Sequence, residues 1–177
     1  MSEGTTPEAA GTVAEPGRAD ALRERLKERI YASLTLLAVL VGLAQNGHAS
    51  HLGASVSVAV TALGLWLATL VADLQAHPVA HGRMPRLTEV RHTLFVSSPL
   101  LTSAVGPLLL VGLSATGVMH LSTALWIAVG SEVATLAAWG CAGGVRMGAG
   151  PLGALVTGAL NAVIGAGVVA VKLLAGH

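Results

Sequence analysis

The sequence predicts an all-α, polytopic membrane protein: a bundle of five transmembrane helices with an N-terminal amphipathic helix. Three observations support this fold class. Of the 177 residues, 53% are hydrophobic and 11% are charged, whereas an ordinary soluble domain has about 25% charged residues. Five apolar stretches are long enough, or nearly so, to cross about 30 Å of hydrocarbon as helices. None of these stretches alternates apolar and polar residues at every second position, as a transmembrane β-barrel would require.

The segment before the first span is polar. Residues 1–17 are small, polar and contain Pro and Gly, which predicts a disordered lead, and they lack the basic start and apolar core of a cleavable signal peptide. In residues 18–29 and just beyond, Leu22, Leu26 and Ile30 recur at every fourth position. This spacing predicts an amphipathic helix on the cytoplasmic membrane surface, and a solvated basic cap that only fixes topology is the alternative.

The membrane domain is expected to cover residues 30–177. The first span is short, and we expect it to take its opening turn from the amphipathic segment. The five expected spans are approximately 30–45, 54–76, 94–113, 122–141 and 152–172.

The basic residues predict the orientation of the bundle. Nine of the ten Lys and Arg residues precede the first span or lie between spans two and three or four and five, and the tenth is Lys172. The positive-inside rule therefore predicts a cytoplasmic N-terminus and an outside C-terminus. The bias toward Ala, Gly, Val, Leu and Arg is typical of a GC-rich bacterial genome, so we expect a bacterial inner-membrane protein surrounded by lipids. A net charge of +1 leaves no basic field for nucleic acid, and the single cysteine, Cys141, excludes an internal disulfide framework.

Glu132 is the plainest candidate for a functional residue. It lies near the middle of the fourth span, and Ala124, Ala128 and Glu132 share one helical face. An ionisable group at membrane depth costs about 2.5–3.5 kcal/mol, so it requires a reason. We expect a protonatable or ion-coordinating group on an ion path with its neighbours Ser131 and Thr135. The alternative is a protonated carboxyl that joins two helices by a hydrogen bond.

The fifth span carries a polar residue and a row of small ones. We expect Asn161, midway along this span, to hydrogen-bond to Glu132 at similar depth. A small-residue ridge favours close helix packing, against a helix of this chain or of a second copy, and we expect a homodimer. The ridge consists of Ala154, Gly158, Ala162, Ala166 and Ala170.

The third span combines prolines with hydroxyl groups. Pro99 and Pro107 each free a backbone carbonyl one turn back, and nearby hydroxyl groups can bond to such carbonyls. Ser98 and Thr102 therefore become candidates for a hydroxyl-lined ion pathway beside a cavity. Simple packing kinks are the alternative.

A second polar cluster lies at the cytoplasmic end of the second span. Asp73 and His77 are one helical turn apart, and His81 follows after Pro78. Carboxylate and imidazole groups can bind a divalent transition metal or relay protons near neutral pH, so these three residues form a candidate metal or entry site. A histidine that only interacts with the helix end is the alternative.

Taken together, five spans with this orientation resemble the vacuolar iron transporter family. The resemblance is distant and architectural. It includes Asp73 toward the cytoplasmic end of span two, the sequence GPLLLVGL that ends span three, and the Gly-rich loop before a small-residue fifth span. As in some members of that family, no cytoplasmic metal-binding insertion separates spans two and three. The resemblance implies a five-helix dimer that moves divalent cations against protons.

We therefore expect a small cation transporter or channel, proton-coupled or specific for a divalent metal, that uses an intramembrane carboxylate. The alternative is a membrane scaffold or accessory subunit that packs through its fifth span and transports nothing itself. No catalytic set is recognisable, so we expect no enzymatic activity, and no cofactor is indicated beyond a proton or divalent metal ion as substrate.

Overall fold

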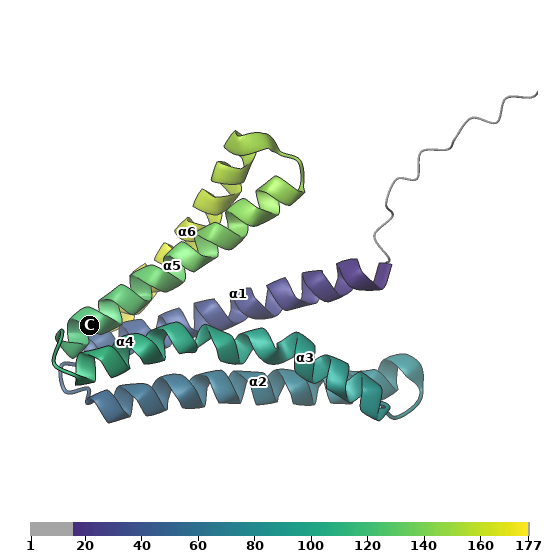
Figure 1. Ribbon diagram of the computed structural model, residues 1–177, viewed down its shortest axis with the longest axis horizontal. Helices are drawn as coiled ribbons and strands as arrows, with labels where there is room; N and C mark the ends of the chain where they lie inside the picture. The colour runs from purple at the N-terminus through teal and green to yellow at the C-terminus, as the bar shows by residue number, and fades with distance from the viewer. Residues whose placement is uncertain (1–15, 177) are drawn as a thin grey trace, which may run out of the picture.

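The structure, a computed structural model, describes residues 16–176, with the side chains of 16–25, 80, 81 and 96 left out. The expected disordered lead lies outside the described residues, apart from Pro16 and Gly17, which begin the first helix. Within the described range the fold is all-helical and has no strand (Figure 1). The helices are α1 (Pro16–Gln45), α2 (His51–His81), α3 (Leu87–Ser103), α4 (Val105–Ala115), α5 (Leu121–Arg146) and α6 (Gly150–Ala175).

Helix α1 is the centre of the bundle. It is one continuous helix through the expected boundary between an amphipathic segment and a first span. It packs against α2, α3, α5 and α6. Its apolar half supplies the most deeply buried side chains, because four neighbouring helices cover it. Leu36, Leu37, Leu40 and Val41 are each at most 1% exposed.

Four helical segments are long and apolar enough to cross a membrane, by length and composition. They are His51–Val79, Leu87–Ala115, Leu121–Arg146 and Gly150–Ala175. They include the second to fifth expected spans, and α3 and α4 together form the third. The short first span, 30–45, is not one of the four. It is instead the apolar half of the central helix α1.

The break between α3 and α4 has a clear cause. Pro107 lies in the first turn of α4, where a missing backbone N–H is tolerated, but its ring crowds the carbonyl four residues earlier, at Ser103. Helix α3 ends at that residue, and α4 begins after Ala104. At Pro107 the third span therefore has a break between two helices instead of a kink within one helix.

Pro99 leaves α3 intact because a hydroxyl compensates for it. The proline cannot donate to the carbonyl of Phe95, and the Ser98 hydroxyl donates to that carbonyl at 2.8 Å instead. Thr102 likewise donates to the carbonyl of Pro99, at 3.0 Å. The expected re-satisfaction of freed carbonyls by hydroxyl groups is thus confirmed at Pro99.

Helices α5 and α6 form a tight antiparallel pair that leans away from α1 toward its α5–α6 turn (Figure 1). A Cβ on Gly140 would lie 2.5 Å from the Thr157 carbonyl oxygen and 2.9 Å from the Cα of Gly158. The Thr157 hydroxyl also donates to the Gly140 carbonyl at 2.8 Å. The absence of a side chain at Gly140 therefore allows the two backbones to meet, and Gly144 meets Ala154 in the same way.

The small-residue ridge of α6 is only partly used in this contact. Ala154 and Gly158 are buried against α5, whereas Ala166 and Ala170 are exposed and Ala162 is intermediate. Residues four apart drift around a helix with 3.6 residues per turn, so a ridge at strict steps of four leaves the interface. The buried face continues instead through Gly165, whose nearest neighbours are side-chain atoms of α5 and α1.

We expect Gly140→Ala to destabilise the protein by about 1–3 kcal/mol, the usual result of forcing a methyl group into a closely packed contact. Thermal unfolding of the purified protein in detergent measures the effect. Gly130→Ala is the matched control, because a Cβ at Gly130 meets nothing within 4 Å. Equal stability of the two variants would contradict the close contact between α5 and α6.

Candidate functional site

Polar side chains continue the buried face of α1 toward its N-terminal half. The apolar core stripe of α1 includes Ala32, Leu36 and Leu40, and one turn earlier the same stripe reaches Glu28, which is 6% exposed. Ser33, 1% exposed, lies on the adjoining stripe with Leu37. Helix α1 therefore presents a carboxylate and a hydroxyl to the interior of the bundle, next to its leucine core.

Glu132 of α5 faces these groups. The predicted face of Ala124, Ala128 and Glu132 is confirmed as buried, and the Glu132 side chain is 5% exposed. The Ser33 hydroxyl hydrogen-bonds to the Glu132 carboxylate, and the positive charge of Arg29 acts on it. Among the described residues, the Oε2 atom of Glu132 has no hydrogen-bond partner. The site therefore has one carboxylate oxygen available inside the bundle.

Glu28 is tied to α2. The Thr69 hydroxyl donates to Glu28 Oε2 at 3.2 Å. Each of the two buried carboxylates, Glu28 and Glu132, thus has a hydroxyl donor on a neighbouring helix. A hydroxyl donor stabilises a carboxylate that burial would otherwise penalise.

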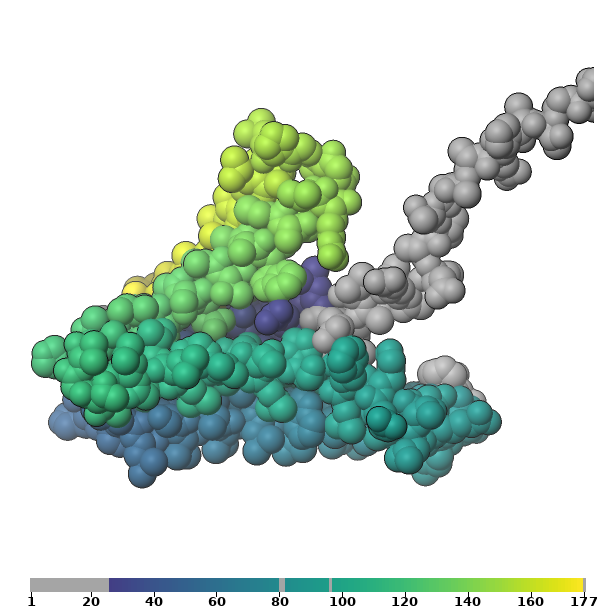
Figure 2. Space-filling model, viewed as in Figure 1, coloured from purple at the N-terminus to yellow at the C-terminus, as the bar shows by residue number. Residues whose placement is uncertain are grey.

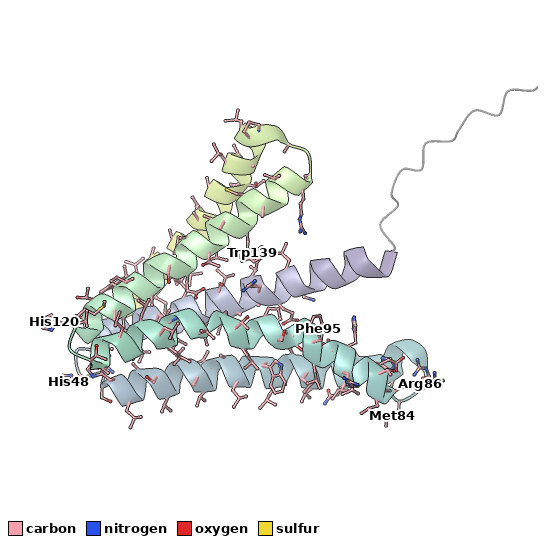
Figure 3. All side chains as sticks on the ribbon, viewed as in Figure 1. His48, Met84, Arg86, Phe95, His120 and Trp139 are labelled. Carbon is pink, nitrogen blue, oxygen red and sulfur yellow. The ribbon has the colours of Figure 1, made fainter. Side chains whose placement is uncertain are left out.

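Arg29 and Trp139 form the next layer of the site. The Arg29 guanidinium lies 4.9 Å from the centroid of the Trp139 ring, a cation–π distance. In Figure 3, Trp139 lies between α5 and α1. Beside this pair is a cavity of about 320 Å³, here called the α1–α5 cavity. It is lined by Leu26, Arg29, Pro99, Trp139, Ala142, Gly143 and Arg146.

The expected pairing of Glu132 with Asn161 is wrong. Asn161 donates to the Thr157 carbonyl of its own helix at 3.0 Å and lies against Gly140. Gly140 is two helical turns from Glu132 along α5. Helices α5 and α6 are antiparallel, and the register set by their glycine contacts brings Gly165, rather than Asn161, toward the level of Glu132.

The other hydroxyl groups of the predicted ion pathway bond to their own helices. Ser131 donates to the Ala128 carbonyl and Thr135 to the Ser131 carbonyl, each at 2.8 Å. Ser98 and Thr102 bond within α3, as described above. The structure therefore does not join these four hydroxyl groups to Glu132, and their role in a pathway stays a prediction.

The three residues of the candidate metal cluster, Asp73, His77 and His81, all belong to α2. His77 Nε2 lies 3.4 Å from Glu89 Oε2 of α3, and Asp73 is exposed. The side chain of His81 lies outside the described residues, although α2 continues through Pro78 to this residue. Among the described residues, no group of three or more His, Cys, Asp or Glu side chains could hold a metal ion.

Glu89 fixes the turn between α2 and α3. It accepts hydrogen bonds from Arg83 at 2.5 and 3.0 Å and from the backbone N–H of Arg86 at 2.6 Å. The side-chain hydrogen bond to Glu89 raises the pKa of the Arg83 guanidinium above its usual value. His77 therefore meets a carboxylate that already has two other partners and that holds the start of α3.

Sequence reasoning missed Glu28, Arg29 and Ser33 as site residues. The stripe of Leu22, Leu26 and Ile30 suggested that the opposite, charged face of this segment is solvated. A signal was nevertheless present, because extending the Leu40–Leu36–Ala32 stripe back by four residues leads to Glu28. The core face of the apolar half of α1 predicts the buried face of its polar half, since the helix is unbroken.

No protein-family model, no curated protein and no solved structure matches this chain.

We expect the hydrogen bond between Ser33 and Glu132 to couple α1 to α5. In a double-mutant cycle of Ser33→Ala and Glu132→Gln, the unfolding free energies should reveal a coupling of about 1 kcal/mol, since helix-to-helix hydrogen bonds in membranes contribute about 0.6 to 1.7 kcal/mol. The same cycle with Ser131→Ala in place of Ser33→Ala should give a coupling near zero, because Ser131 bonds to its own helix. Similar couplings in both cycles would contradict the contact.

Proposed function

We propose that this chain is a small bacterial inner-membrane transporter or channel for a cation, with Glu132 as the group that takes up and releases the ion. One observation carries the proposal. Glu132 is 5% exposed, has an unpartnered Oε2 among the described residues, and belongs to a helix that could span a membrane. A glutamine would join two helices with a smaller penalty, so the presence of a carboxylate at this position favours ion chemistry.

The surroundings of Glu132 favour a proton over a divalent metal. The positive charge of Arg29 acts on the carboxylate and opposes the approach of a metal cation. Zn²⁺ requires about four protein or water ligands and Ca²⁺ six to eight, whereas Ser33 is the hydroxyl group that bonds to Glu132. A proton requires one oxygen, and Oε2 supplies it.

His77 is our candidate for proton exchange at the mouth of the pathway. It lies beside Glu89 at the end where α2 stops and α3 begins. Imidazole can relay protons near neutral pH. Most basic residues lie at this end, which supports its proposed assignment to the cytoplasmic face, with the C-terminus outside. The homodimer stays a prediction.

Ion flux in proteoliposomes tests the function. We expect an imposed pH gradient to dissipate through the wild-type protein, and Glu132→Gln to reduce that flux at least about tenfold, because an amide cannot exchange the proton. Glu132→Asp keeps a titratable carboxyl and should retain part of the flux. Gly130→Ala, on the same helix in open space, is the matched control and should leave flux unchanged.

Parallel assays with K⁺, Mn²⁺ and Fe²⁺ identify the ion. Metal flux that depends on Glu132 would support a cation transporter whose substrate is the metal ion rather than the proton. Absence of flux for every ion, in wild-type protein with an intact helical circular dichroism spectrum, would overturn the proposal. The scaffold or accessory subunit would then be the better explanation, with Glu132 as a helix-packing group.

A further inference from the structure

The α1–α5 cavity carries positive charge that the described residues leave partly unbalanced. Its lining includes the guanidinium groups of Arg29 and Arg146, and no carboxylate lines it among the side chains that the structure describes. The Arg146 side chain forms no ion pair or hydrogen bond with any described residue. Two like charges that share a cavity repel each other, and an anion between them would relieve that repulsion.

The volume of the cavity and its other lining residues suit a ligand that has a small polar group attached to an apolar part. A volume of about 320 Å³ lies at the lower end of the ~300–1,000 Å³ typical of small-molecule sites. Leu26, Pro99 and Ala142 supply apolar walls, and the Trp139 ring forms one side. Figure 2 shows the surface hollowed where the α5–α6 end leans away from α1, so the cavity is open to the outside of the bundle.

The position of the cavity also favours a membrane-derived ligand. Arg146 ends α5 and Arg29 lies in the polar half of α1, so the cavity lies at the end of the spanning helices rather than at their middle. Tryptophan and arginine at this level are typical of the membrane–water interface. Basic pockets between transmembrane helices at the cytoplasmic side bind phosphorylated lipid head groups.

We propose that the α1–α5 cavity binds the phosphate group of an anionic ligand, either an anionic phospholipid head group or free phosphate, between Arg29 and Arg146. Arginine suits this role because its planar guanidinium donates two parallel hydrogen bonds to phosphate oxygens. Arg29 also interacts with Glu132 and stacks on Trp139, so the ligand binds next to the ion site without occupying it.

Trp139 provides a direct readout of binding. In a full-length Trp66→Phe, Trp126→Phe background, Trp139 is the single tryptophan, since the chain has 3. We expect short-chain phosphatidylglycerol to change Trp139 fluorescence saturably at concentrations at which short-chain phosphatidylcholine does not. Inorganic phosphate, titrated in parallel, distinguishes the two sources: saturation by phosphate at equal affinity assigns a free anion, and weaker or absent saturation assigns the lipid.

Two variants with matched controls test the site. Arg146→Gln should raise the apparent Kd for phosphatidylglycerol about tenfold or more, as expected for loss of a charge-assisted hydrogen bond. Gly143→Leu should also weaken binding, by filling the cavity while keeping both charges, because a Cβ at Gly143 meets nothing within 4 Å. Arg91→Gln, at an exposed position on α3, and Gly130→Leu, also in open space, should leave the Kd unchanged.

The proposal is overturned if phosphatidylcholine saturates as well as phosphatidylglycerol, because the cavity would then recognise only acyl chains. It is also overturned if no lipid or phosphate changes the Trp139 signal, or if Arg146→Gln and Arg91→Gln weaken binding equally. The binding measurement requires no ion flux, so its result is independent of the proposed transport activity.

Discussion

The rest of the structure depends on how α1 is buried. Four helices surround it, and one stripe along its length changes from leucine to carboxylate without leaving the interior. Glu28 and Ser33 must therefore find polar partners on neighbouring helices, because unpaired polar groups in an apolar interior cost several kcal/mol. Thr69 of α2 and Glu132 of α5 supply them. These contacts set the rotation of α1 relative to both neighbours.

The contact between α5 and α6 depends on small residues. These two helices meet through backbone atoms, and the glycines at 140, 144 and 158 make the approach possible. The Thr157 hydroxyl adds a hydrogen bond to the Gly140 carbonyl, and the outer face of α6 presents large apolar side chains. Helix α5 thus takes part in two different interfaces: it meets α1 through buried polar side chains and α6 through closely approaching backbones.

The sequence predicted the helices and several of their faces. The buried face of α5 followed from the spacing of Ala124, Ala128 and Glu132, and the compensation at Pro99 followed from the adjacent hydroxyl of Ser98. Periodicity defines a face in this way because it depends on one helix alone. The pairing of Glu132 with Asn161 failed because it depends on the register between two helices, which close contacts at Gly140 determine. Glu132 and Asn161 each lie near the middle of their expected spans, but the two residues are not at the same height in the bundle.

The polar stripe of α1 also affects how the chain reaches its folded form. Glu28 and Ser33 make the buried face of α1 costly on its own, since a buried polar group is penalised until it finds a partner. Thr69 is synthesised soon afterwards, whereas Glu132 follows Ser33 by about 100 residues. At about 5–20 residues per second, the ribosome needs on the order of 5–20 s to produce that partner. During this interval Ser33 is without the partner that Glu132 supplies, so the polar contacts of α1 are completed only once α5 has been made.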